Sequence, residues 1–208
     1  VEAPLTLPHL DVRVLVDGPE GLWLGTSGGL YLKPKESDLY LLQPSPTAEF
    51  LEVRDISRGL DASGRRAVLF EGWVQWVRAD DLSPEALPLQ DTSLRSIALT
   101  EDTTWLGGDL GVVRLSDGFE SSLGGVAGPV HDLAIGPDAS LWIASQSGVY
   151  RLMGEEPTLI ASEAATVLLG HTKGVWSGDD EGVSWFGELG EVTRYPAGIG
   201  QQGCTEQV

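Results

Sequence analysis

The chain has 208 residues, and its 13 Lys and Arg side chains are outnumbered by 31 Asp and Glu side chains, so its formal net charge at pH 7 is −18. This charge argues against nucleic acid as a partner, because an acidic surface repels phosphate backbones. The sequence has no apolar run of about 18 residues, and no transmembrane segment is therefore expected.

In chain order, a short hydrophobic strand followed by a second strand that contains tryptophan recurs at nearly constant spacing. The four clear copies carry in their second strands Trp23, Trp105, Trp142 and Trp176. A degenerate copy at 53–70 has no tryptophan in that position. The second residues of the five opening strands lie at 13, 54, 95, 131 and 166. A repeat of this length, built from short strands, is typical of β-propeller blades.

The repeat predicts an all-β fold, a single five-bladed β-propeller with four antiparallel strands per blade. One domain would cover residues 1–208 and end in a polar tail at 197–208. The expected blades lie approximately at 11–43, 51–90, 92–123, 128–161 and 164–196. The tryptophans are interpreted as packing between adjacent blades. Ring closure has two alternatives, because the last outer strand would come from Glu191 to Tyr195 or from Leu5 to Leu7.

The first repeat carries a family resemblance. From Asp17 to Tyr31 it reads Asp-Gly-Pro-Glu-Gly-Leu-Trp-Leu-Gly-Thr-Ser-Gly-Gly-Leu-Tyr, and weaker copies lie at 101–115, 136–152 and 170–186. This pattern resembles the repeat of two-component-regulator propellers, which occur in the sensor regions of bacterial signalling proteins. The second copy departs from the pattern, since it lacks the tryptophan. The resemblance implies a propeller with a sensory role.

The sharpest candidate for a binding site is one repeated position in the opening strands. It holds Arg13, Arg54, Arg95, His131 and Thr166. The innermost strand of each blade lines the central channel of a propeller, so these side chains are expected to form a ring near the turns between second and third strands. Two guanidinium groups about 8 Å apart repel by roughly 2 kcal/mol at an effective dielectric constant of about 20, so the ring needs counter-charges.

Two interpretations supply these counter-charges. In one, a small anionic ligand such as an organic acid or a carboxylate-bearing sugar binds the arginines, whose planar fork suits a carboxylate. In the other, Asp55, Asp132 or the acidic turns form ion pairs with the arginines between blades, and the ring is structural.

Catalytic patterns are weak. No two of His9, His131 and His171 have the spacing of metal ligands, and Cys204 is the single cysteine, so no metal site and no cofactor are predicted. A glycoside hydrolase would need two carboxylates facing each other across the channel. Strand alternation places Asp55 and Asp132 on the face opposite their ring neighbours. We therefore expect no enzyme activity.

The predicted function is that of a non-catalytic ligand-binding or sensory-type propeller, with a small anionic molecule or a protein as its partner. The alternatives are a platform for protein–protein interaction, with Trp73 and Trp76 as exposed candidates, and a carbohydrate-binding, lectin-like propeller with several equivalent sites between blades. A periplasmic or extracellular location is favoured. The sequence does not predict an oligomeric state.

Overall fold

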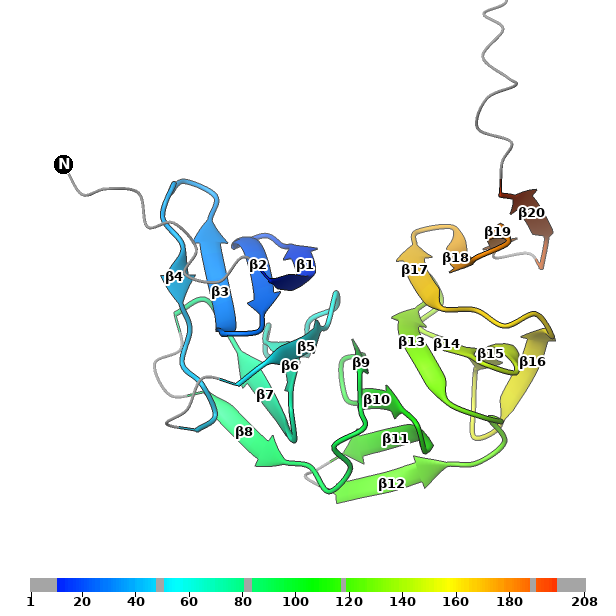
Figure 1. Ribbon diagram of the computed structural model, residues 1–208, viewed down its shortest axis with the longest axis horizontal. Coiled ribbons are helices and arrows are strands. Elements are labelled where there is room, and N and C mark those ends of the chain that lie inside the picture. The colour runs from blue at the N-terminus through cyan, green and yellow to red at the C-terminus, as the bar shows by residue number, and fades with distance from the viewer. Residues whose placement is uncertain (1–10, 48–50, 81–83, 117–118, 188–189, 198–208) are drawn as a thin grey trace, which may run out of the picture. The chain divides into compact units, whose positions relative to one another are not determined.

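The computed structural model describes residues 11–47, 51–80, 84–116, 119–187 and 190–197. In these ranges the chain forms β-strands and no helix. The strands make five antiparallel sheets of four strands, and in each sheet the strands follow one another in chain order (Figure 1). This confirms the predicted fold class of five four-stranded blades.

The first compact unit extends to Leu123 and contains three blades. Blade 1 consists of β1 (Val12–Asp17), β2 (Gly21–Thr26), β3 (Gly29–Pro34) and β4 (Leu41–Leu42). Blade 2 consists of β5 (Val53–Ile56), β6 (Arg66–Phe70), β7 (Trp73–Val77) and β8 (Glu85–Pro88). Blade 3 consists of β9 (Ser96–Leu99), β10 (Thr104–Gly108), β11 (Gly111–Ser116) and β12 (Phe119–Leu123).

The second compact unit begins at Gly124 and contains two blades. Blade 4 consists of β13 (Val130–Ile135), β14 (Leu141–Ser145), β15 (Gly148–Leu152) and β16 (Pro157–Ala161). Blade 5 consists of β17 (Val167–His171), β18 (Gly174–Asp179), β19 (Gly182–Gly187) and β20 (Val192–Pro196). The outer strand of blade 5 is thus β20, which pairs with β19, while Leu5 to Leu7 lie outside the described residues.

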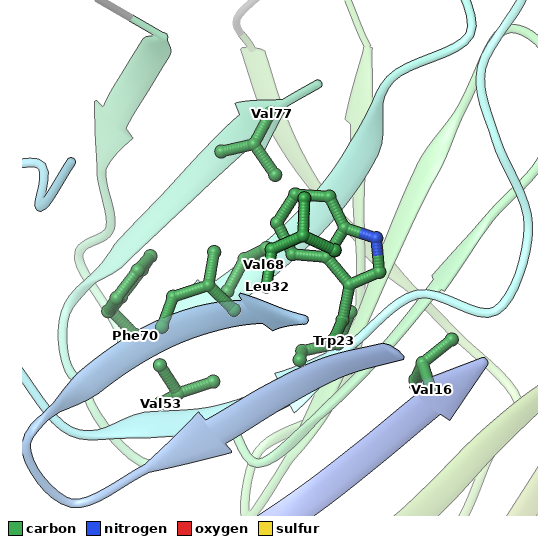
Figure 2. Close-up of a cluster of buried hydrophobic side chains, with 9 residues drawn as sticks. Val16, Trp23, Leu32, Val53, Val68, Phe70 and Val77 are labelled. Carbon is green, nitrogen blue, oxygen red and sulfur yellow. The ribbon is translucent and has the colours of Figure 1, made fainter. Parts of the chain in front are cut away.

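Hydrophobic clusters between adjacent blades hold each unit together. Between blades 1 and 2, Trp23 is fully buried and packs in one cluster with Val16, Val53, Val68 and Phe70 (Figure 2). Each fully buried aliphatic or aromatic side chain contributes roughly 1.5–3 kcal/mol. The cluster is therefore a main source of stability in the first unit.

The same arrangement recurs in the second unit. Trp142 of blade 4 packs against Phe186 of blade 5, with 5.4 Å between ring centroids. Trp23 and Trp142 hold the same place in their repeats, since each lies opposite the fifth residue of its inner strand, Val16 and Ala134. The interpretation of these two tryptophans as packing between blades agrees with the structure.

Blade 2 departs from the pattern in a way that the structure explains. Its Ala67 stands where the other blades have tryptophan, and the cross-strand partner of Ala67 is Trp76 of β7. Directly paired residues of adjacent strands lie on the same face of a sheet. Blade 2 therefore carries its indole on the usual face but one strand further from the inner edge. Trp76 packs on the cluster between blades 2 and 3, and its Nε1 donates to Thr104 Oγ1 at 3.2 Å.

Candidate functional site

The five predicted site residues occupy equivalent places at the start of the inner strands. Arg13, Arg54 and His131 each coincide with a register irregularity in the pairing of the first two strands of their blade. Arg95 and Thr166 directly precede β9 and β17, and their backbone N–H groups donate to the carbonyl oxygens of Gly107 and Gly178. Such bulges re-aim a side chain at the end of a strand.

Among the five predicted site residues, Arg54 of blade 2 has the most extensive set of contacts. Arg54 Nη1 donates to the carbonyl oxygens of Thr92 and Leu94, the latter at 2.9 Å, and Arg54 Nη2 lies 3.2 Å from Glu71 Oε1. Thr92 and Leu94 precede the inner strand of blade 3, whereas Glu71 lies in the turn between β6 and β7. Arg54 therefore links blade 2 to blade 3 and reaches the segment beside Arg95.

Arg13 and Arg95 are more exposed and are also paired with carboxylates. Arg13 Nη2 lies 3.0 Å from Asp11 Oδ2, and its Nη1 lies 3.6 Å from Glu52 Oε1 in the segment before β5. Arg95 pairs with Asp109 in the turn between β10 and β11. Arg54 and Arg95 thus each pair with a carboxylate in a turn between the second and third strands of their blade.

Carboxylates of the described residues already neutralise the charges of these three arginines. The arginines contact four carboxylates, and the side chains of Glu71 and Asp109 are 58% and 55% exposed. Exposed ion pairs of this kind contribute about 0–1 kcal/mol each. The carboxylate pairing therefore adds little to stability, and Arg54 is held in addition by its two carbonyl partners.

His131 and Thr166 belong to the second unit. The His131 side chain is partly buried, and Thr166 Oγ1 donates to the carbonyl oxygen of Gly178 at 3.1 Å. A site formed by all five residues stays a prediction.

Asp55 and Asp132 have a structural role that sequence reasoning missed. Asp55 Oδ1 accepts from the N–H of Ile56 in its own strand, and Oδ2 accepts from the N–H of Ile97 in the inner strand of blade 3, both at 2.8 Å. One carboxylate oxygen thus binds a backbone N–H group of blade 2, and the other binds one of blade 3. Asp55 therefore joins the inner strands of blades 2 and 3 by hydrogen bonds, and we call an aspartate with these two bonds a latch.

The latch recurs in the second unit. Asp132 accepts from Leu133 in its own strand at 2.8 Å and from Leu168 of blade 5 at 2.7 Å. Both aspartates thus bind backbone N–H groups of two blades, and their ion pairing with arginines stays a prediction. The sequence signal was an aspartate directly after the repeated position, in blades 2 and 4.

An ion pair between a buried arginine of blade 2 and a partly buried glutamate of blade 1 was also missed. Arg66 is only 2% exposed, its Nε lies 3.0 Å from Glu20 Oε1, and its Nη1 donates to the carbonyl oxygens of Ser57 and Arg58 at 2.9 Å. Burial raises the pKa of Glu20, but hydrogen bonds from its own backbone and from Trp23, together with the charge of Arg66, outweigh this and lower the pKa. Arg66 stands at the position that Leu22 has in blade 1, and a charged residue at an apolar repeat position was the available signal.

Trp73 and Trp76, the candidates for an exposed interaction surface, are both partly buried and pack against hydrophobic clusters. Among the described residues, no group of three or more His, Cys, Asp and Glu side chains is arranged to hold a metal ion. No helix in the described part of the chain is long and apolar enough to cross a membrane.

Comparisons with known proteins concern the fold. No family model matches the chain, and no curated protein matches its sequence. The extracellular domain of the hybrid two-component system BT4673 from B. thetaiotaomicron is similar, with a TM-score of 0.72 and 16% identity over 93% of this chain and 28% of that one. The corresponding domain of BT3049 gives a TM-score of 0.74 and 15% identity over 94% of this chain and 30% of that one.

An enzyme shares the fold as well. A catalytically inactive variant of virginiamycin B lyase from Staphylococcus aureus, solved with quinupristin, gives a TM-score of 0.76 and 14% identity over 93% of this chain and 73% of that one. The chain spans less than a third of the two extracellular domains. The chain therefore has a β-propeller fold with five blades, and extracellular domains of two-component systems are among the structures that share it, in agreement with the resemblance of its repeats.

Proposed function

We propose that the chain is a non-catalytic recognition propeller of the sensory type, working in the periplasm or outside the cell. The observation that carries the proposal is that polar side chains at the inner strands are bonded to the protein's own backbone and side chains. Asp55 and Asp132 each bind two backbone N–H groups, and Arg54 binds two carbonyl oxygens and a carboxylate. A general acid or base has to exchange protons with a substrate, and a carboxylate that already accepts two N–H bonds is poorly suited to this.

The fold neighbours support the sensory part of the proposal. Two of them are extracellular domains of two-component systems. Because the lyase shows that the same fold also supports catalysis, the argument against an enzyme depends on the side chains of this chain and not on its fold.

As the ligand we propose a small anion that carries a carboxylate, bound in the first unit at Arg54 and Arg95. Their carboxylate partners Glu71 and Asp109 are more than half exposed, so a ligand carboxylate can replace them at little cost. A guanidinium group offers the ligand two parallel N–H donors, which favours a carboxylate held in fixed geometry. Arg13, in the same unit, is proposed as a further contact.

The test is a thermal-shift screen of uronates, sialic-type sugars, di- and tricarboxylates and neutral sugars on the native chain and on Arg54→Ala/Arg95→Ala. We expect an anion to raise the Tm of the native protein and to leave the double variant unchanged. The matched control is Lys35→Ala/Lys173→Ala, which removes two exposed cations elsewhere and should keep the response.

Two results would overturn the anion site. One is an equal shift in native protein and Arg54→Ala/Arg95→Ala. The other is the absence of any shift with anions, together with a large loss of stability in the double variant. The second result would show that these arginines are scaffolding and would direct the search to protein partners.

A further inference from the structure

The first unit contains a pocket of about 300 Å³ between blades 2 and 3. Its lining includes Trp76 of blade 2 and Thr103 and Thr104 of blade 3. The turn before Thr104 is fixed by a hydrogen bond from the Thr100 N–H to the Thr103 carbonyl oxygen, at 2.9 Å. This volume is at the lower end of the range for small-molecule sites.

The pocket lies where blade 2 departs from the repeat. In blade 1 the indole is on β2, at Trp23, and it is fully buried between blades. In blade 2 the indole is on β7, at Trp76, one strand further out, and Ala67 takes the inner place. Trp76 is only partly buried and lines the pocket, although its Nε1 is tied to Thr104. An indole held in place in this way presents a fixed aromatic surface.

The charges that line the pocket are predominantly negative. Arg65 is held on the wall by Asp61 and Glu85, with 2.8 Å from its Nε to Asp61 Oδ2 and 2.8 Å from its Nη1 to Glu85 Oε2. Burial raises the pKa of Asp61, but hydrogen bonds from Arg65 and Ser63 and the charge of Arg65 lower it overall, so this carboxylate stays ionised at neutral pH.

Two further acidic residues line the pocket, Glu101 and Asp102 in the turn between β9 and β10. Both residues are exposed, and the carbonyl oxygen of Glu101 accepts from the Ala62 N–H at 3.3 Å, which holds this turn against blade 2. The lining therefore contains four acidic residues and one arginine. The excess is three negative charges beside an indole.

We propose that this pocket binds an alkylammonium group. A cation beside an indole is attracted by the negative face of the ring, and the carboxylates of Glu101 and Asp102 supply the counter-charge. The net charge of −18 attracts cations to the protein as a whole. The group is either a free amine or the side chain of a lysine on a partner protein. This site is separate from the anion site at Arg54 and Arg95 and does not depend on it.

The test is calorimetric titration of the native chain with two probes, cadaverine and Nα-acetyl-lysine amide. Nα-acetyl-norleucine amide, which has a similar side chain without the charge, is the neutral comparison. We expect saturable binding of at least one ammonium probe, weaker at high NaCl concentration, and no binding of the norleucine compound. Binding of cadaverine alone indicates a free amine, and binding of both probes leaves the lysine of a partner as a source.

Two variants locate the site. Glu101→Gln/Asp102→Asn changes only exposed side chains and should weaken binding about tenfold. Trp76→Leu should weaken binding by roughly the same factor through loss of the indole face. The matched control is Glu155→Gln/Glu156→Gln, which removes two adjacent exposed carboxylates in the second unit and should leave the Kd unchanged.

Three results would overturn the proposal. They are the absence of binding by both ammonium probes, equal binding of the norleucine compound, and equal weakening by the two paired-acid variants. The third would mean that cations respond to the overall charge and not to this pocket. Because the acid variants change exposed turns, they keep the test valid even where Trp76→Leu fails to fold.

Discussion

At the scale of single residues, the most consequential contact is the ion pair of the buried Arg66 with the partly buried Glu20. Arg66 belongs to β6, whereas Glu20 lies in the turn between β1 and β2, so the pair joins blades 1 and 2. Glu20 Oε1 also accepts from the indole Nε1 of Trp23, the central ring of the cluster between these blades. The ion pair and the hydrophobic cluster are therefore connected through the hydrogen bond between Glu20 and Trp23.

We predict that Arg66→Met lowers the free energy of unfolding by about 3 kcal/mol, because it removes the positive partner of a partly buried carboxylate and leaves two carbonyl oxygens without their donor. Lys35→Met, which removes an exposed cation from the same unit, should cost less than about 0.5 kcal/mol. Urea denaturation monitored by tryptophan fluorescence measures both. Equal stability of the two variants would contradict the importance given to the pair.

At the scale of elements, each unit uses an aspartate to join two inner strands. Asp55 joins β5 to β9, and Asp132 joins β13 to β17. In both cases the second N–H partner is two residues after the repeated position of the next blade. The latch thus fixes how the inner strands of two neighbouring blades are aligned along their length. The apolar clusters supply most of the stabilisation between blades.

We predict that Asp132→Asn destabilises the protein by about 1–3 kcal/mol, because an amide has only one acceptor oxygen and leaves one of two N–H donors unsatisfied. The exposed Asp180→Asn in the same unit is the control and should stay within about 0.5 kcal/mol of the native protein. Urea denaturation gives the free energies, and hydrogen exchange at the Leu168 amide should become faster in Asp132→Asn alone. Unchanged exchange and stability would show that the latch is dispensable.

At the scale of the whole molecule, ionised carboxylates in both units link stability to pH. The pKa of Glu20 lies below its ordinary value of 4.5, and the pKa values of Asp61 and Asp138 lie below 3.8. For each, burial acts in the opposite direction and is outweighed, in Asp138 by hydrogen bonds from Ser140 and Arg151 and by the charge of Arg151. The unfolded chain therefore binds protons more readily than the folded chain.

We predict that the free energy of unfolding falls as the pH is lowered from 6 through the ordinary carboxyl range of about 4. These carboxylates stabilise the fold fully above the unfolded-state pKa and lose their effect as the pH falls through the folded-state pKa. The measurement is urea denaturation at a series of pH values in about 0.5 M NaCl, which screens the repulsion of the acidic surface. Stability that is constant or rises toward pH 3 would contradict this account.

The sequence was sufficient for the blades, because tryptophan, glycine and strand spacing repeat locally and each repeat carries its own hydrophobic pattern. It was insufficient for the contacts between blades. Glu20 and Arg66 are 46 positions apart, and Asp55 and Ile97 are 42 apart, so only the folded arrangement brings them together. The sequence also did not predict that Trp76 of β7 takes the place of the tryptophan missing from β6. This substitution can be recognised only when the cross-strand partner of Ala67 is known.

The central claim is that this propeller recognises its ligand without transforming it. The most direct measurement is a calorimetric titration of the native protein with the anion and alkylammonium compounds described above, followed by proton NMR of each recovered compound. The account predicts saturable heat of binding and an unchanged spectrum for the compound that binds. Continued heat flow together with the spectrum of a new product would show that the chain is an enzyme and would contradict the account.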